Sequence, residues 1–166
     1  MDSPHFKWDY ASYVPLHYLD PDATVPVVLL PSVVCSDLDE NLKVGGLVHD
    51  AAVKSNKKAI FLGSCALAHK VVRGPHLWPS EEHMDTDKKL ISMFCEGKID
   101  ALIDWLPDYA RDVVTEMGGR PMAGMLGATA AMANANSSGN GVRGKQWGPY
   151  GQSSGSGNAS ICVLPH

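Results

Sequence analysis

One stretch constrains the fold of this chain more than any other: the apolar run Ala59-Ile-Phe-Leu62, followed by a Gly-Ser-Cys turn and then by His69. An apolar run with β-branched and aromatic residues, bounded by turn residues, predicts a buried strand. In layered α/β proteins, chemically active residues collect where such strands end. We therefore expect His69, just past the predicted strand end, to lie near a functional site.

A second apolar run, Val25 to Ser32, predicts another strand, buried on both faces as in a parallel sheet. Between the two runs, apolar residues recur at helical spacing, and Ser36 or Asp37 can cap a helix that continues to about Ser55. Gly45-Gly46 permits this helix to pack closely on the sheet. The pattern predicts a strand-helix-strand unit with a right-handed crossover. We expect an α/β fold whose central sheet is mainly parallel or mixed and is flanked by helices.

The other apolar patterns are mostly helical. Pro15 makes a long regular helix improbable in the opening segment, which we expect to be a short helical or irregular stretch. The expected helices after His69 run from Asp85 to Gly97, from Ile99 to Trp105, from Pro107 to Met117 before Gly118-Gly119, and through the small-residue run Met122 to Ala133. The small-residue run predicts a helix that packs very close to a neighbour.

Residues 134–160 change composition sharply and are rich in Gly, Ser and Asn without an apolar period. This composition predicts a flexible linker or mobile loop. Residues 160–164 are strand-like, so we expect the chain to return to the sheet there. At 166 residues, of which 45% are hydrophobic, the chain fits one domain spanning residues 1–166.

Charge and composition argue against several classes of function. The net charge of −4 comes from 18 acidic and 14 basic residues with no long block of like charge, so we expect no nucleic-acid role. No apolar stretch is long enough to cross a bilayer and no signal peptide is evident, which makes the cytoplasm the expected location. The four cysteines form no Cys-x-x-Cys pair, so we expect reduced, mostly buried thiols at Cys35, Cys65, Cys95 and Cys162.

Histidines are the first candidates for chemistry. His69 can act as a general acid or base because imidazole exchanges protons near neutral pH; the alternative is a partly buried histidine bonded to a loop carbonyl. His69, His76 and His83 recur at intervals of seven, which suggests a metal site. Gly74, Pro75 and Pro79 prevent the single helix that would align them.

Other candidates lie farther from the apolar run. Glu116 falls near the end of a predicted helix, where it is either a solvated surface residue or a metal ligand. Tyr10, Tyr13 and His17 are candidates to line a pocket for an aromatic ligand, and aromatic packing is the alternative. The run Gly155 to Asn158 does not match a phosphate loop, because no strand is predicted before it.

The order of motifs resembles the C-terminal portion of class III extradiol ring-cleavage dioxygenases, over nearly the whole chain. The motifs that carry the resemblance are Asp9-Tyr10, Val14-Pro-Leu-His-Tyr-Leu-Asp-Pro21, Val25-Pro-Val-Val28, Leu62-Gly-Ser-Cys-Ala-Leu-Ala-His69, the acidic helix with Glu116, Gly127-Ala128 and Gly155-Ser-Gly-Asn-Ala159. Each motif is short, and the likeness lies in their order and spacing.

The resemblance implies non-haem Fe(II) held by two histidines and one glutamate, with dioxygen inserted beside a ring hydroxyl. By position, Glu116 would be the carboxylate ligand and His69 the acid/base that handles the substrate hydroxyl proton. Tyr10 stands where many members have histidine, which is similar to the branch that cleaves aminophenols. Ala68 stands where members often carry Ser. The family's iron-binding histidines belong to an N-terminal half, and neither His5 nor His49 lies in a matching motif.

The resemblance thus implies an oxidoreductase that opens the ring of a catechol or an ortho-aminophenol, as in aromatic compound catabolism. Since iron needs its full ligand set, we expect this chain alone to bind iron poorly and to require an N-terminal half or partner subunit, in an oligomer. The alternative function is a non-catalytic binding or structural subunit on the same fold.

Overall fold

The computed structural model describes residues 9–71, 74–136 and 141–166. Their elements, in chain order, are α1 (Tyr10–Leu19), α2 (Leu38–Lys54), α3 (Glu81–Glu96), α4 (Ile99–Asp112), the 3-10 helix η1 (Glu116–Gly119), α5 (Arg120–Ala135), β1 (Val142–Ser153) and β2 (Ser156–Pro165). The chain divides into two compact units, Met1–Pro31 and Ser32–His166, and we describe each by itself. One domain over residues 1–166 stays a prediction.

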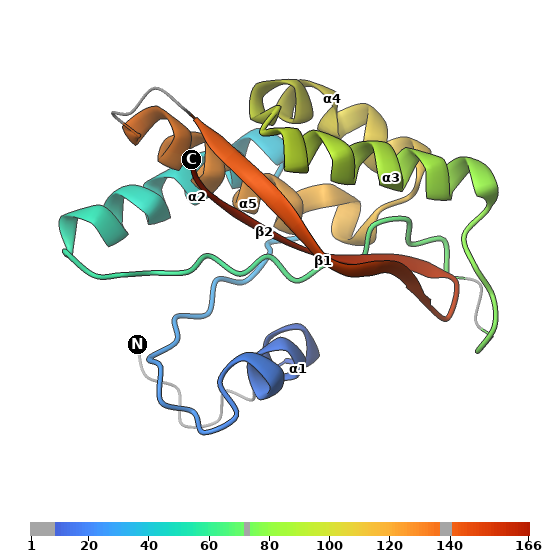
Figure 1. Cartoon of the computed structure of the whole chain (residues 1–166), viewed down its shortest axis with the longest axis horizontal. Coiled ribbons are helices and arrows are strands. Elements are labelled where there is room, and N and C mark those ends of the chain that lie inside the picture. The colour runs from blue at the N-terminus through green and yellow to red at the C-terminus, as the bar shows by residue number, and fades with distance from the viewer. Residues whose placement is uncertain (1–8, 72–73, 137–140) are drawn as a thin grey trace. The chain divides into compact units, whose positions relative to one another are not determined.

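The first unit contains α1 and the turn that follows it (Figure 1). The Asp9 carboxylate caps α1 by accepting a 3.0 Å hydrogen bond from the Ser12 amide. Pro15 lies inside this ten-residue helix, which confirms the expectation of a short helical segment. Beyond it, the Asp20 carboxylate accepts hydrogen bonds from the Thr24 and Val25 amides at 3.0 and 2.8 Å and so fixes the turn.

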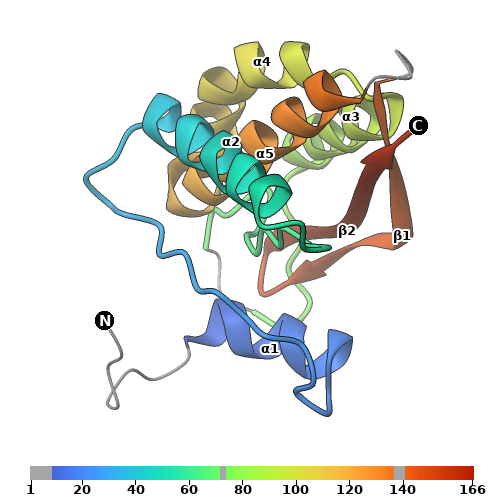
Figure 2. The same ribbon diagram turned by 90° about the vertical axis from the view of Figure 1, so that its left-hand side faces the viewer.

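In the second unit, α2 packs along α5 (Figure 2). α2 begins as predicted, with Asp37 and Glu40 forming a reciprocal capping box. Gly45 is buried against the backbone of α5, where a Cβ would collide with the Gly124 carbonyl oxygen. The predicted close packing is therefore confirmed, although the partner of Gly45 is a helix and not a sheet.

The core lies where α3, α4 and α5 meet. Leu90, Ile91 and Phe94 are buried on one face of α3, and Gly97 ends that helix with a φ of 73°, both as predicted. The sequence predicted two separate helices, Ile99 to Trp105 and Pro107 to Met117, and this break at residue 106 is wrong. A single helix, α4, runs through Pro107, because buried side chains continue on one face across the proline, which removes one backbone hydrogen bond.

The two predicted strands near residues 25–32 and 59–64 are not formed. Both runs are extended chain, and most of their apolar side chains are exposed; Val28 is 84% exposed and Ile60 92%. The backbone of residues 58–65 has no hydrogen-bond partner within the described ranges. A strand requires a neighbouring chain to receive its backbone hydrogen bonds. The described residues are thus helix-rich with a small antiparallel sheet, and the expected central sheet is not present among them.

That sheet is a hairpin of β1 and β2, paired from Val142 with Pro165 to Ser153 with Ser156. The loop predicted over residues 134–160 is wrong for residues 142–153 and 156–160, and the predicted strand at 160–164 is confirmed within a longer β2. Periodicity missed β1 because its inward positions are not consistently apolar. Gly144, for example, lies so close to the Phe94 carbonyl on α3 that a Cβ would not fit.

A buried carboxylate joins the hairpin to the helices. Asp87, on α3, is fully buried and accepts hydrogen bonds from the Tyr109 hydroxyl on α4 and the Tyr150 hydroxyl on β1, at 2.7 and 2.6 Å. The Ala68 amide lies 3.2 Å from both carboxylate oxygens. Burial and the Asp87 charge raise the pKa of both tyrosines, so their hydroxyls remain donors. One side chain therefore ties four segments together.

The close α2–α5 contact predicts opposite effects at adjacent glycines. Gly45→Ala should lower the free energy of unfolding by about 1–3 kcal/mol, because its Cβ would meet backbone that must move. Gly46→Ala is the matched control, since its Cβ would meet only an ordinary 3.8 Å contact, and it should be neutral or stabilising by up to about 1 kcal/mol. Urea unfolding measures both; equal effects at the two positions would contradict the described packing.

Asp87 predicts a stability that depends on pH. Burial raises the pKa of its carboxyl group, partly offset by the tyrosine and Ala68 hydrogen bonds and the His83 charge. The folded chain therefore holds this proton more tightly than the unfolded chain, and stability is gained as pH falls through the folded pKa towards the unfolded value of about 3.9.

Asp87→Asn removes this titration and places amide hydrogens against hydroxyl donors, which should cost about 2–3 kcal/mol at neutral pH. The gap between wild type and Asp87→Asn in unfolding free energy should then widen on acidification, measured by denaturant titrations at several pH values. Asp85→Asn, at an exposed α3 position, is the control. A gap that stays constant or narrows towards acid would refute the raised pKa.

Candidate functional site

The segment Ala66–His69 is held by backbone contacts on two sides. On one side, the Leu67 amide donates to the Gly157 carbonyl at 2.9 Å, and the Gly157 amide donates to the Ala68 carbonyl at 2.8 Å. On the other, the His69 amide donates to the Val113 carbonyl at 3.3 Å. With the Asp87 contact to Ala68, three parts of the second unit fix this segment. These hydrogen bonds thus fix the backbone that carries His69.

His69 is half-buried, and its Nδ1 lies 2.8 Å from the Ser156 hydroxyl at the start of β2. The sequence predicted either an acid/base or a histidine bonded to a loop carbonyl. Its partner is instead a side-chain hydroxyl, which can donate to or accept from the ring. The imidazole is therefore oriented by a group that serves both of its protonation states.

Glu116 lies at the start of η1 and not near the end of a long helix, because α4 ends at Asp112. Its Oε2 accepts a 2.6 Å hydrogen bond from the Ala66 amide, and the neighbouring Thr115 hydroxyl donates to the Ala66 carbonyl at 3.0 Å. Burial, with the Glu116 charge beside it, raises the pKa of the Cys65 thiol to about 12. The raised pKa favours the neutral thiol of Cys65, which is a weaker nucleophile than a thiolate.

The structure brings His69 and Glu116 to opposite ends of one four-residue segment. Glu116 bonds the backbone at Ala66, and His69 is the last residue of the segment. Neither lines the cavity of about 480 Å³ beside this segment, whose lining residues are Ala68, Lys70, Trp78, Pro79, Ser80, Glu82, His83 and Gly155. Convergence of the two side chains on one hollow shaped for a flat ring stays a prediction.

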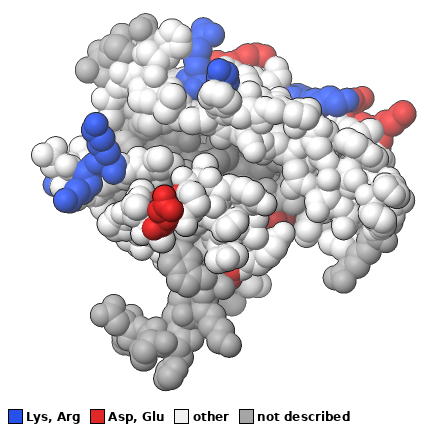
Figure 3. Space-filling model, turned by 60° about the horizontal axis from the view of Figure 1, so that its bottom comes forward, with Lys and Arg blue, Asp and Glu red and all other residues white. Residues whose placement is uncertain are grey.

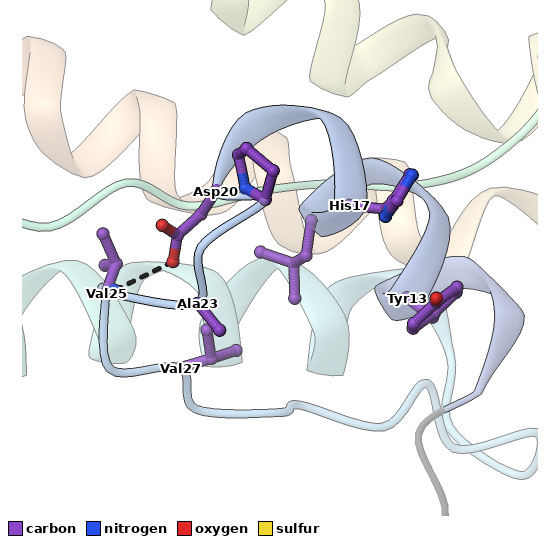
Figure 4. A pocket seen from close by; sticks show the side chains of 8 residues that line it. Tyr13, His17, Asp20, Ala23, Val25 and Val27 are labelled. Carbon is purple, nitrogen blue, oxygen red and sulfur yellow. Dashed lines mark hydrogen bonds between the residues drawn. The ribbon is translucent and has the colours of Figure 1, made fainter.

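Tyr10 belongs to the first unit, where it begins α1 and is 81% exposed. A cavity of about 490 Å³ lies within that unit (Figure 4), and its lining residues are Tyr13, Leu16, His17, Asp20, Pro21, Ala23, Val25 and Val27. Tyr13 and His17 thus line a cavity together, with stacked rings whose centroids are 6.0 Å apart, whereas Tyr10 is not in its lining.

The described residues do not by themselves fit an iron centre. Within residues 9–71, 74–136 and 141–166, no group of three or more His, Cys, Asp or Glu side chains is placed to hold a metal. His69, His76 and His83, which recur at intervals of seven, do not form a metal site in the described residues. His76 lies in an exposed turn, and His83 on α3 faces the 480 Å³ cavity. His49 pairs with its neighbour Asp50, and His5 lies outside the described residues.

Two residues of the site escaped the sequence analysis. Asp87 shares the helical spacing of Leu90, Ile91 and Phe94, so an acid on an apolar face was the signal that could have identified it. Ser156 appeared in the sequence only within the run Gly155 to Ala159, which was tested as a phosphate loop and counted among the motifs of the resemblance, with no role assigned to the serine. No pattern along the chain links it to His69, because the two residues are 87 positions apart.

The surface of the second unit exposes apolar side chains that a core would ordinarily cover. Leu47 and Val53 on α2 are 57% and 63% exposed, and Ile60 on the extended run is exposed as well. On the face shown in Figure 3, most side chains are uncharged, and the basic ones form a few separate groups. In the described residues the four cysteines are free, and no helix there is long and apolar enough to span a membrane.

Comparisons with known proteins identify the family. The chain is 27% identical over 133 residues to a 2-aminophenol 1,6-dioxygenase beta subunit from Pseudomonas sp, covering 70% of this chain and 44% of that protein. It is 25% identical over 115 residues to a 3,4-dihydroxyphenylacetate 2,3-dioxygenase from Escherichia coli, covering 64% of this chain and 41% of that protein. The chain therefore spans less than half the length of these curated relatives.

The model of a protein family, described as the catalytic LigB subunit of aromatic ring-opening dioxygenase, matches residues 1–148. The resemblance to extradiol dioxygenases inferred from the motifs is confirmed at the level of the family. Since the match covers most of its length, the chain belongs to the family of the catalytic LigB subunit of aromatic ring-opening dioxygenases.

Proposed function

We propose that this chain contributes the acid/base residue of an extradiol dioxygenase, which opens an aromatic ring next to a hydroxyl group. The observation that supports this most is the fixed segment Ala66–His69, which holds a half-buried imidazole at one end and is bonded to Glu116 at the other. Family membership supports the reaction class. Catalysis of this kind requires a proton-exchanging group held in one orientation, which the Ser156 contact supplies.

We propose that His69 exchanges a proton with the substrate hydroxyl. An imidazole ring can take up a proton in one step and return it in another. Burial of Ala66, Leu67 and Ala68 keeps the segment before it from shifting as the charge changes. Tyr10 is proposed to contact the substrate on the basis of its position in the family motif alone.

We propose that the substrate is a catechol or an ortho-aminophenol. The two relatives are named for 2-aminophenol and for 3,4-dihydroxyphenylacetate, which are benzene rings carrying a hydroxyl group next to an amino group or to a second hydroxyl group. Tyr10, by its resemblance to the aminophenol-cleaving branch, favours the aminophenol.

We propose that Glu116 is one ligand of Fe(II) and that the remaining ligands come from outside this chain. One carboxylate, already bonded to the Ala66 amide, supplies too few ligands to hold iron. Among the described residues, no group of three or more possible metal ligands includes it. The chain would then hold iron only together with an N-terminal half or a partner subunit. One relative is named a beta subunit, which supports an assembly of more than one chain.

The unpaired apolar runs support the same assembly. We propose that residues 25–32 and 59–64 become strands of a mainly parallel or mixed sheet once the rest of the family fold is present. An extended apolar segment with free backbone groups is a template for strand addition. We further propose that the complete enzyme is an oligomer that works in the cytoplasm.

Complementation tests this function directly. The chain is expected to hold little iron alone and to gain iron and oxygen uptake with 2-aminophenol or 3,4-dihydroxyphenylacetate when co-expressed with the N-terminal part of the named beta subunit. Glu116→Gln, which keeps an acceptor for the Ala66 amide, should lose the iron but retain the fold by circular dichroism. If no oxygen is taken up either by the chain alone or by the co-expressed complex, the result would support the alternative of a non-catalytic subunit.

The same complex tests the role of His69. His69→Ala should lower kcat by about 10²–10⁴-fold with KM changed far less, because a positioned proton-transfer group acts on the transition state. His76→Ala, at an exposed histidine outside the site, should leave both constants unchanged. Equal losses in kcat and in substrate affinity would remove His69 from the proposed role.

A further inference from the structure

We propose that Thr115 is a positioning residue that, through the backbone of Ala66, sets the orientation of the Glu116 carboxylate. The Thr115 hydroxyl donates to the Ala66 carbonyl at 3.0 Å, and the Ala66 amide donates to Glu116 Oε2 at 2.6 Å. Two neighbouring side chains thus hold both backbone polar groups of one residue. The inference rests on the proposed function in taking Glu116 and His69 as residues of the site.

Each of these two hydrogen bonds has a single possible direction. A carbonyl oxygen can only accept and an amide N–H can only donate, so the Thr115 hydroxyl must be the donor and the Glu116 carboxylate the acceptor. Thr115 is 5% exposed and Ala66 8%. Within the described ranges, the structure gives the Ala66 carbonyl no other donor. Loss of the hydroxyl would leave that carbonyl unpaired at a buried position, which is costly, and would favour a shift of Ala66.

The backbone of Thr115 is itself fixed, so its hydroxyl has a defined direction. The Thr115 amide donates to the Ala110 carbonyl in the last turn of α4 at 3.1 Å, and the Gly118 amide donates to the Thr115 carbonyl at 3.1 Å. Val114, just before it, has a φ of 52°, which a β-branched residue rarely adopts. Such a conformation persists where surrounding contacts over-determine it.

The same stretch of chain also contacts the other end of the Ala66–His69 segment. The Val113 carbonyl accepts a hydrogen bond from the His69 amide at 3.3 Å. Residues 113–116 therefore lie alongside residues 66–69 and bond to the first and the last of them. Since a small displacement of a reacting group costs much of the rate, the Thr115 hydroxyl affects the site through its neighbours.

NMR of the full chain tests this arrangement without any need for activity. Thr115→Val removes the hydroxyl but nearly keeps the shape. The Ala66 amide should then exchange with deuterium about fivefold faster relative to the α4 core amides, the effect of losing one ordinary hydrogen bond. The nuclear Overhauser effect between the Ala66 amide proton and the Glu116 side chain should weaken as well. Thr115→Ser, which keeps the hydroxyl, should retain both wild-type signatures.

Thr129→Val is the matched control. Thr129 is also 5% exposed, and its hydroxyl donates to the Met125 carbonyl at 2.8 Å within α5. Removing it deletes a comparable buried hydrogen bond that has no contact with Ala66. The Ala66 exchange rate relative to the core, and its Overhauser effect with Glu116, should therefore stay as in wild type.

The complemented complex provides a second readout. Thr115→Val should lower kcat about tenfold with KM changed far less, because the site residues are displaced without loss of a group that contacts the substrate. Thr115→Ser should recover most of the rate. An unchanged kcat in Thr115→Val of an active complex would overturn the positioning role.

Two NMR results would also overturn the inference: an Ala66 amide that exchanges no faster in Thr115→Val than in Thr129→Val relative to the core, or a wild-type chain without the Overhauser effect. If Thr115→Val does not fold, Thr115→Ser decides the matter, because losing either wild-type signature there would refute the inference. Failure of the proposed function is separate. The expected NMR effects combined with no oxygen uptake in the complex would refute the dioxygenase proposal and leave the contact between Thr115, Ala66 and Glu116 intact.

Discussion

The structure of the second unit depends on a buried carboxylate. Asp87 receives hydrogen bonds from two tyrosine hydroxyls and from the Ala68 amide, and thereby holds the segment before His69 against α3, α4 and the hairpin. Taking a carboxylate out of water is costly, and the cost is tolerated only where donors surround the charge. The same donors locate the backbone that carries His69, so the stability of the core and the geometry of the candidate site rest on a shared set of contacts.

Around Asp87, backbone hydrogen bonds position the candidate site residues His69 and Glu116. The Ala66–His69 segment exchanges backbone hydrogen bonds with Gly157 on one side and donates one to Val113 on the other. At its first residue, the Ala66 amide donates to the Glu116 carboxylate. Ser156 then orients the ring. Each contact joins residues far apart in sequence. These contacts explain how a small unit can hold an imidazole in one orientation, although the run at residues 59–64 just before it has no backbone hydrogen-bond partner in the described part of the chain.

The sequence predicted those features that depend on neighbouring residues. The N-terminal cap of α2, the buried face of α3 and the stop at Gly97 follow local patterns, and the structure confirms them. The failures have a physical cause in long-range partners. The runs at 25–32 and 59–64 have strand composition, but no strand among the described residues pairs with them. By contrast, β1 is a strand because β2 pairs with it and α3 accommodates Gly144. At the site, motifs marked His69 and Glu116 as candidates. Asp87 had a local signal, an acid on the apolar face of a helix, but no local pattern reveals the contact between Ser156 and His69.

The central claim is that Ala66–His69 is a rigid, paired segment, in contrast to the unpaired run that precedes it. Amide hydrogen exchange, resolved by residue, measures this directly. The account predicts that the amides of Leu67, Ala68 and Gly157 exchange as slowly as those of the α3 and α4 core, while those of Ile60 and Leu62 exchange rapidly. Amides of Leu67 and Ala68 that exchange as fast as that of Ile60 would contradict it.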